Sequence, residues 1–398
     1  MFSAKSIFIL QEWRKNMIGH EKRTICMIGA FPPPVHGQAV AFETLAESPE
    51  LREKYNVIKI DYAPKKRLNK YLMIPYKLLR NLSMIQSLKK VVRSRKVDIF
   101  YLGISSSDQG ARRDHIIAKT IDKALEHSKL IIHHHGGNFR TFYDSTDDNH
   151  RAMVDYYLER TDCAIVLTPR LRKLFNGLLP ESKVKVVSNG ISASNKLPEK
   201  EINKRIASLS QRDIVHILYL SNMKKTKGYY ELLKSAPLLL DNGIDFEMTF
   251  AGAFESVADE EEFHNYVNEH RLGQKVKYKG VVTGNEKNCL LGENDIFVLP
   301  TAYPNEGQPI SILESMAAGM AIVTTDHGGI SDVIKDGING IIITAITPDE
   351  IAKAVIRLSS NRDFMAKVCV ENMRISNEQY LEQHYVNNMI DIFNEYSE

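Results

Sequence analysis

Cysteines are few in this sequence and stand far apart. Of the 398 residues, only Cys26, Cys163, Cys289 and Cys369 are cysteine. Their spacing matches neither a zinc-binding cluster nor the dense pairing of a small disulfide-stabilised domain, so both kinds of protein are excluded. Scattered single cysteines are typical of a reducing compartment, and we expect the protein in the cytoplasm.

Long apolar runs are absent as well. No stretch approaches the about 18 apolar residues that a transmembrane helix needs. The apolar run at residues 7–10 is too short for the core of a signal peptide. We therefore expect a soluble protein, or one held peripherally at the inner face of the cell membrane.

Charge of one sign is not in large excess. Lysine and arginine number 52 against 49 for aspartate and glutamate, which gives a net charge of +3. Nucleic-acid-binding proteins show a strong positive excess, so no nucleic-acid partner is expected. Any positive charge that matters for function must be local.

Short β-branched runs alternate with helical stretches along both halves of the chain. The strand-like runs of the first half are residues 24–30, 55–62, 97–104, 129–135, 163–168 and 184–188. Those of the second half are residues 216–220, 246–252, 276–282, 296–300, 322–325 and 340–344. Such alternation predicts the α/β class, with parallel sheets covered by helices on both faces. A Gly-x-Gly-x-x-Gly sequence after the first run is missing, which argues against a dinucleotide-dependent dehydrogenase.

The alternation is interrupted at residues 192–213, which are polar and irregular. We interpret this stretch as a linker and predict two doubly wound, Rossmann-like domains at residues 1–195 and 213–375. Residues 376–398 are predicted to form a C-terminal helix that packs back on the N-terminal domain. Ligands of doubly wound sheets bind beyond the carboxyl ends of the strands, so a cleft between the domains is the expected site.

Two glutamates, Glu306 and Glu314, follow the apolar run at residues 296–300. Pro309 suits the first turn of a helix and Gly319 suits its end, which places Glu306 in a loop and Glu314 on the helix. Amides of a first helical turn favour an anionic group such as a phosphate, and carboxylates accept hydrogen bonds from hydroxyls. This combination suits a nucleotide-sugar. An exposed surface ion pair is the alternative that the spacing leaves open.

Three consecutive histidines end a predicted strand and precede a pair of glycines. Neighbouring residues of a strand point to opposite faces, so His133, His134 and His135 cannot readily share a metal ion, and no metal site is expected. We expect His135, beside Gly136 and Gly137, to reach the cleft as a hydrogen-bonding group. Structural roles are expected for the other two histidines.

A lysine-rich loop follows the run at residues 216–220. Lys227 stands just before a predicted helix, where its charge adds to the helix N-terminus and can neutralise a diphosphate without a metal ion. A solvated lysine loop remains the alternative. In the other domain, Gly37 follows the first predicted strand, and a glycine there lets a ligand approach the backbone closely.

Taken in order, these motifs resemble the retaining glycosyltransferases of family 4. In the second domain the similar residues are Lys227-Gly228, residues 295–300, the pair Glu306 and Glu314, residues 316–319, Gly328-Gly329 and Asp336-Gly337 with Gly340. In the first domain the likeness is looser and is confined to His36-Gly37, His135-Gly136-Gly137 and Asn189-Gly190. The resemblance implies a GT-B fold, with residues 1–195 on the acceptor side and residues 213–375 binding a nucleotide-sugar donor. It also implies no cofactor and no obligatory metal ion.

The same resemblance implies different roles for the two glutamates. Glu314 holds the ribose hydroxyls, whereas Glu306 lies beside the donor sugar. The catalytic residues implied are Glu306, Lys227, which stabilises the departing diphosphate, and His135, which assists by hydrogen bonding. The donor-binding residues implied are Gly37, Asn222, Lys227, Gly307, Gln308, Pro309, Ile310 and Glu314. The acceptor-side residues implied are His135, Gly136 and Gly137.

Two positions depart from the family pattern. Asn222 stands where the family usually has an arginine, five positions before the lysine that contacts the diphosphate, so one fixed positive charge is missing. Lys224 and Lys225 are the candidates to replace it. Asp332 stands where a glutamate is more usual, a difference of one methylene.

The expected function is that of a retaining, metal-independent glycosyltransferase. It would move a hexose-type sugar from a UDP- or GDP-linked donor to a glycan or lipid-linked acceptor, in the biosynthesis of a cell-surface polysaccharide, lipopolysaccharide, capsule or glycolipid. Two alternatives stay open: a non-catalytic subunit that binds sugar nucleotides, which Asn222 favours, and a nucleotide-sugar epimerase on the same fold.

A strongly basic segment lies between Pro64 and Lys96, and it contains no acidic residue. Apolar residues at helical spacing within it are predicted to face the sheet, and these are Leu78, Leu82, Ile85, Leu88 and Val92. The basic residues could then touch anionic lipid, each contributing about 1 kcal/mol near a membrane surface. A solvated basic helix is the alternative.

Overall fold

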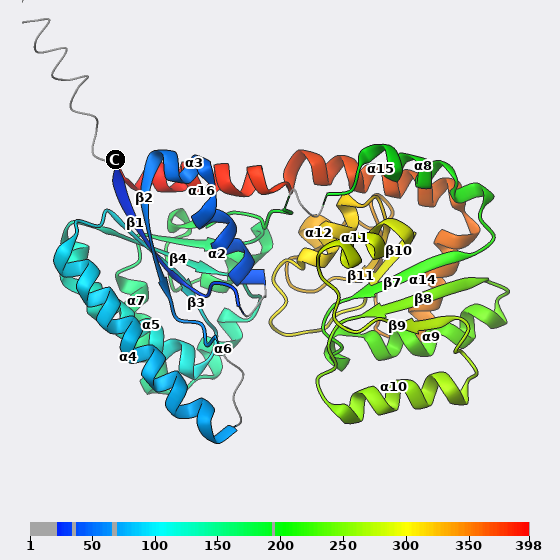
Figure 1. Ribbon diagram of the computed structural model, residues 1–398, viewed down its shortest axis with the longest axis horizontal. Coiled ribbons are helices and arrows are strands. Elements are labelled where there is room, and N and C mark those ends of the chain that lie inside the picture. Colours follow the sequence, from blue (N-terminus) through cyan, green and yellow to red (C-terminus); the bar gives the residue numbers. More distant parts are fainter. Residues whose placement is uncertain (1–21, 34–36, 66–69, 193–195, 398) are drawn as a thin grey trace, which may run out of the picture.

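The computed structural model describes residues 22–33, 37–65, 70–192 and 196–397, so His36 lies outside the described residues. These residues form two domains, each built on a six-stranded parallel sheet with helices packed on it (Figure 1). The strand order is β2-β1-β3-β4-β5-β6 in the N-terminal domain and β12-β11-β10-β7-β8-β9 in the C-terminal domain. The predicted α/β class with two doubly wound domains is confirmed.

The strands lie where the sequence predicts them. Those of the N-terminal domain are β1 (Arg23–Gly29), β2 (Tyr55–Asp61), β3 (Ile99–Ile104), β4 (Lys129–His134), β5 (Cys163–Val166) and β6 (Val184–Val186). Those of the C-terminal domain are β7 (Val215–Leu220), β8 (Phe246–Ala251), β9 (Val276–Tyr278), β10 (Ile296–Leu299), β11 (Ala321–Thr325) and β12 (Ile341–Ile343). The interior strands β3 and β10 are buried along their whole length, as expected for parallel sheets covered on both faces. β9 ends sooner than predicted, because Gly280 takes a positive φ of 68°.

Helices connect the strands in both domains. The N-terminal domain contains α2 (Gly37–Glu47), α3 (Pro49–Lys54), α4 (Lys70–Ser94), α5 (Asp108–Ile121), α6 (Phe139–Ser145) and α7 (Asp148–Glu159). The rest are α8 (Glu199–Ala207), α9 (Tyr229–Asp241), α10 (Val257–Glu269), α11 (Gly284–Glu293), α12 (Ile310–Ala317), α13 (Ile330–Val333), α14 (Pro348–Ser360), α15 (Arg362–Gln379) and α16 (Glu382–Ser397). Several begin at a residue whose side chain accepts a backbone N–H, such as Ser107 before α5 and Ser256 before α10.

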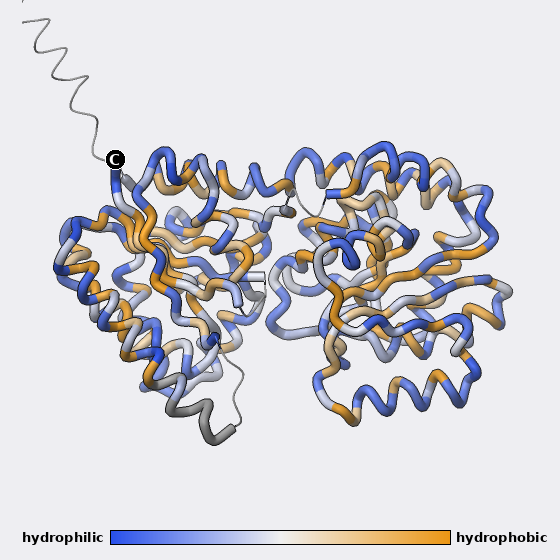
Figure 2. The backbone as a smooth tube through the Cα atoms, in the orientation of Figure 1, coloured by the Kyte–Doolittle hydropathy of each residue, from blue (hydrophilic) through white to orange (hydrophobic). Residues whose placement is uncertain are grey.

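The core of each domain follows its sheet. Apolar residues concentrate on the strands, whereas the outer helices carry many hydrophilic residues (Figure 2). Within the described part of the chain, no helix is both long enough and apolar enough to cross a membrane.

The stretch interpreted as a linker, residues 192–213, is not irregular throughout. It contains α8, and Ile202, Ile206 and Leu209 belong to the buried core of the C-terminal domain. Charged residues surround these three in the sequence, so only a narrow apolar face marks the helix. The C-terminal domain therefore begins before residue 213, and the predicted boundary is wrong.

The last helix returns to the N-terminal domain. Tyr385, Met389 and Phe393 of α16 share a buried core with residues of α2 and β3, and the Tyr385 hydroxyl donates to the Ala41 carbonyl at 3.2 Å. Figure 1 shows α15 and α16 one after the other along the same side of both domains. The helix begins later than the predicted residue 376, because residues 376–379 complete α15.

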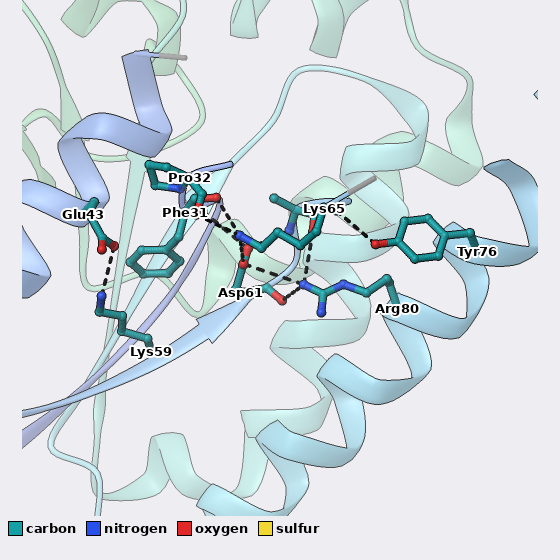
Figure 3. A network of polar contacts seen from close by, with 9 residues as sticks. Phe31, Pro32, Glu43, Lys59, Asp61, Lys65, Tyr76 and Arg80 are labelled. Atoms are coloured by element: carbon teal, nitrogen blue, oxygen red, sulfur yellow. Dashed lines mark hydrogen bonds and ion pairs between the residues drawn. The ribbon is translucent and has the colours of Figure 1, made fainter. Parts of the chain in front are cut away.

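The basic segment forms α4, and two of its cations are used inside the protein. The Lys65 ammonium pairs with Asp61 and donates to the Phe31 carbonyl at 2.8 Å (Figure 3). The Arg80 guanidinium donates to the carbonyls of Asp61 and Ala63, both at 3.1 Å. Arg80 thus ties α4 to the end of β2, and Lys65 ties the segment before α4 to the ends of β1 and β2, so neither cation is free to meet a membrane.

The predicted apolar face of α4 is partly wrong. Leu88 is buried as predicted, together with Met84, but Leu82 is 49% exposed. Leu79 is 66% exposed, and the side chain of Leu78 lies outside the described residues. Met84 and Leu88 pack in the core of the N-terminal domain, which turns the two exposed leucines outward.

Candidate active site

A cavity of about 1070 Å³ lies between the two domains. Its walls come from residues at and beyond the carboxyl ends of strands in both sheets, including β3, β4, β7 and β10. Among the described residues that line it, those with a formal charge, histidine aside, are Lys227, Lys287, Glu306 and Glu314. The predicted interdomain cleft is present, and it brings together the three charged residues predicted for it.

Glu306 lies in the loop between β10 and α12 and is only 7% exposed. Its Oε2 accepts a hydrogen bond from the Thr301 hydroxyl at 3.2 Å and lies 3.2 Å from Nζ of Lys227. Gly228 follows Lys227 with a φ of 77°, and a Cβ there would lie 2.2 Å from the Pro300 carbonyl oxygen. Only glycine fits this turn, which sets the position of Lys227 in the cavity wall.

Glu314 lies on α12 and is 6% exposed. Its Oε1 is 2.5 Å from Nζ of Lys287 on α11. The two glutamates are therefore buried, each beside its own lysine, and the alternative of an exposed surface ion pair is wrong. Nothing in the sequence predicts Lys287 at the site, because it stands in a polar helix without a motif and only the packing of α11 brings it to Glu314.

The backbones of the two domains meet beside Glu306. A Cβ on Gly137 would lie 2.0 Å from the Glu306 carbonyl oxygen, and the Gly137 N–H donates to the Asn305 carbonyl at 3.3 Å. Gly137 lines a neighbouring cavity, whereas His135 and Gly136 line the main one. Gly137 therefore lies at the contact between the domains, and its place on the acceptor side stays a prediction.

The three histidines alternate, as strand geometry predicts. His133 is buried, hydrogen-bonds the Tyr101 hydroxyl at 2.7 Å and stacks on His135 with ring centroids 3.9 Å apart. Burial, with a smaller effect of the neighbouring histidines, lowers the pKa of His133 well below its usual value. His134 lies against Phe139, and burial lowers its pKa to about 4. His134 also lines the main cavity, contrary to the purely structural role expected of it.

The pKa of His134 makes a prediction for stability against pH. Its folded value of about 4 lies below the ordinary 6.5, so the unfolded chain binds more protons in that window. The contribution of neutral, buried His134 to the free energy of unfolding is complete above about pH 6.5. It is lost as the pH falls towards 4. We expect the wild type to lose about 2 kcal/mol more unfolding free energy between pH 7 and pH 5 than His134→Phe, measured by urea denaturation. An equal loss in both proteins would contradict the assignment.

The remaining predicted donor-binding residues differ in their placement. Those that simply line the cavity are Gly37, Gly307, Pro309 and Ile310. Gln308 also lines it, but its Oε1 accepts the Asn189 N–H at 2.7 Å and its carbonyl accepts from Asn189 Nδ2 at 3.1 Å. This side chain therefore joins the two domains. Asn222 is exposed and is not among the described residues of the lining.

Lys224 and Lys225 are paired outside the cavity. Nζ of Lys224 lies 2.7 Å from Oε1 of Glu255, and Nζ of Lys225 lies 2.6 Å from Oε2 of Glu262 on α10. Neither lysine belongs to the described lining. Their geometry does not favour the expectation that one of them replaces the missing arginine charge.

The wall from the N-terminal domain contains a serine loop for which the motifs made no prediction. Ser105, Ser106 and Ser107 follow β3 and line the cavity. The Ser105 Oγ accepts a hydrogen bond from Arg113 at 3.0 Å, and its N–H donates to the buried Asp114 at 3.1 Å. Three serines directly after a predicted strand are the signal that could have identified this loop, since ligands bind at such ends.

Metal ligands do not gather in the part of the chain that the structure describes. No group of three or more histidine, cysteine, aspartate or glutamate side chains there could hold a metal ion. Positive charge in the described lining comes from the ammonium groups of Lys227 and Lys287 instead. The site is thus suited to an anionic ligand held by charge-assisted hydrogen bonds.

Several known proteins with similar sequences are named as glycosyltransferases. Residues 200–375 match the family described as glycosyl transferases group 1. An uncharacterised glycosyltransferase of Methanocaldococcus jannaschii is 30% identical over 233 residues, which are 55% of this chain and 57% of that protein. The chain thus spans little more than half the length of this relative. The UDP-Gal:α-D-GlcNAc-diphosphoundecaprenol α-1,3-galactosyltransferase of Escherichia coli is 23% identical over 315 residues, covering 73% of this chain and 76% of that enzyme.

The fold also matches solved structures. The crystal structure of HepE from Anabaena in complex with UDP superimposes with a TM-score of 0.71 at 15% identity, covering 94% of this chain and all of that one. This similarity confirms the predicted GT-B fold, and the sequence match confirms the resemblance to glycosyltransferases. Residues 200–375 are thus similar in sequence to the glycosyl transferases group 1 family, and the chain as a whole has the GT-B fold.

Proposed function

We propose that this protein is a retaining, metal-independent glycosyltransferase that moves a hexose-type sugar from a UDP- or GDP-linked donor to a glycan or lipid-linked acceptor. The observation that carries the proposal is the pairing of Glu306 with Lys227 and of Glu314 with Lys287 in one interdomain cavity. The first residues of α12 line the same cavity. Carboxylates for hydroxyls, with lysines and helix amides for phosphates, match the chemistry of a nucleotide-sugar.

The arrangement suits departure of a nucleoside diphosphate. The bond between the anomeric carbon and the phosphate oxygen breaks, and Lys227 stabilises the negative charge that forms on the phosphate. Glu306, next to Lys227, supports the positive charge that develops on the sugar ring. With retention, the acceptor hydroxyl attacks on the face that the diphosphate leaves, and a donor phosphate oxygen takes its proton. His135 hydrogen-bonds the sugar or the acceptor from the facing domain.

A lipid-linked acceptor is supported by the relative from Escherichia coli, which is named for transfer to a sugar carried on diphosphoundecaprenol. We propose the same acceptor class for this chain. Such acceptors are intermediates of cell-surface polysaccharides, so the product would belong to a lipopolysaccharide, a capsule or a glycolipid. The enzyme would then work at the cytoplasmic face of the membrane.

Incubation with labelled UDP- and GDP-hexoses, with and without a lipid extract, tests the function. Release of the nucleotide only when lipid is present supports transfer. Binding of the donor without turnover would favour a non-catalytic subunit, and conversion without an acceptor would favour an epimerase. Activity in the presence of EDTA tests metal independence, and the anomeric configuration of the product tests retention.

We further propose that the exposed face of α4 attaches the enzyme to anionic lipid. Leu79 and Leu82 are exposed there, and Lys89, Lys90 and Arg93 are exposed nearer its C-terminal end. The leucines would enter the interface of the bilayer, and each cation would contribute about 1 kcal/mol. Lys65 and Arg80 take no part, because they are bonded within the protein.

Vesicle flotation measures this attachment. The triple charge reversal of Lys89, Lys90 and Arg93 to glutamate should lower recovery with anionic vesicles by at least about tenfold, since about 3 kcal/mol of attraction is removed. Lys353→Glu, a charge reversal at a lysine of α14 whose side chain is 71% exposed, is the control away from α4 and should float like the wild type. Failure of the wild type to bind either anionic or neutral vesicles would end the hypothesis.

A further inference from the structure

Lys287 is the charged residue of the cavity whose role no motif predicts. Its side chain is 19% exposed and that of Glu314 is 7% exposed, with 2.5 Å between Nζ and Oε1. Removing such a pair from water is costly, and apolar residues of similar size often stabilise a protein at least as well. Stability alone therefore does not explain a lysine at this position.

The formal charges of the cavity's described lining, histidine aside, balance one another. Its described lining has two carboxylates and two ammonium groups, paired as Glu306 with Lys227 and Glu314 with Lys287. A nucleotide-sugar brings neutral hydroxyls together with about two negative charges on its phosphates. The hydroxyls can replace the lysines as donors to the carboxylates, and each ammonium can then turn to a phosphate oxygen.

Lysine is well suited to such an exchange of partners. Its ammonium group carries three donors at the end of a flexible stem, unlike the planar fork of arginine. Lys287 lies on the wall from the C-terminal domain, near Gly284 at the start of α11. Lys225, by contrast, is 53% exposed and bonded to Glu262, so it cannot act at the site without leaving that partner.

We propose that Lys287 is a donor-binding residue, which moves from Glu314 to the donor diphosphate when ribose hydroxyls occupy Glu314. Lys227 then holds the phosphate beside the sugar, and Lys287 holds the diphosphate from the ribose side. Lys287 thus supplies the positive charge that Asn222 lacks. This inference rests on the proposed use of a nucleotide-sugar.

Binding of UDP and GDP, compared with binding of uridine and guanosine, tests this role by calorimetry and ligand-observed NMR. Lys287→Met should weaken binding of the preferred diphosphate by about 10- to 100-fold and change nucleoside binding by less than about threefold. Lys287→Arg keeps the charge and should recover most of the loss. Lys225→Met removes a lysine outside the cavity and should match the wild type.

Three results would overturn the inference, in distinguishable ways. Equal weakening of diphosphate and nucleoside in Lys287→Met would show that Lys287 only positions Glu314. Unchanged diphosphate binding in that variant would remove Lys287 from the donor site while the proposed function stands. A wild type that prefers neither diphosphate over its nucleoside would remove the proposed function as well. The ratio of the two affinities is measured on one sample, so partial unfolding of the variant does not distort it.

Discussion

Replacement of Glu306 by glutamine should lower the turnover of sugar transfer by at least about 100-fold and leave donor affinity within about threefold. Glutamine keeps the size of the side chain and can still accept the hydrogen bond from Thr301. It loses the negative charge that faces the developing positive charge of the sugar ring. Lys227 loses its ion-pair partner but remains able to bind the diphosphate, so binding and turnover should separate.

Donor binding by calorimetry and turnover with a saturating donor measure the two quantities. Glu255→Gln is the matched control, because Glu255 is 56% exposed and pairs with Lys224 outside the cavity. That variant should turn over like the wild type. Turnover of Glu306→Gln within about threefold of the wild type would exclude Glu306 from the chemistry.

Replacement of Gly137 by alanine should also abolish most of the transfer activity, for a different reason. The added Cβ would lie 2.0 Å from the carbonyl oxygen of Glu306, a backbone atom that cannot turn aside. The domains must separate locally, and a displacement of about 1 Å at the reacting groups costs about 100-fold in rate. Donor affinity should change little, because the paired lysines and glutamates all belong to the C-terminal domain.

The rate of transfer, the donor affinity and the melting temperature distinguish this effect from unfolding. Gly273→Ala is the matched control, since a Cβ there meets no atom within 4 Å. Wild-type turnover by Gly137→Ala would contradict the prediction. It would show that the domains can move apart at this contact without displacing the reacting groups. Lost donor binding together with lost turnover would show instead that the C-terminal domain is disturbed.

The strands and the two glutamates could be predicted because their signals are local. β-branched runs of the right length mark the strands, and Pro309 marks the start of α12 between Glu306 and Glu314. α8 escaped prediction because its few apolar residues stand among charges, and their partners lie elsewhere in the chain. Helical spacing predicts Leu82 on the buried face of α4, but it is exposed. Spacing identifies a face of the helix and does not tell which of its turns are covered by the rest of the domain.

The sequence by itself determined the α/β class, the two domains, and the order of motifs that places Glu306, Glu314 and Lys227 around a phosphate-sized site. These depend on residues close together in the chain, where propensity and spacing act directly. Only the tertiary structure decided that Lys287 pairs with Glu314, that Gly137 rests against Glu306, and that Lys224 and Lys225 are paired outside the cavity. Those contacts join separate elements or opposite domains, and packing, rather than local preference, brings them together.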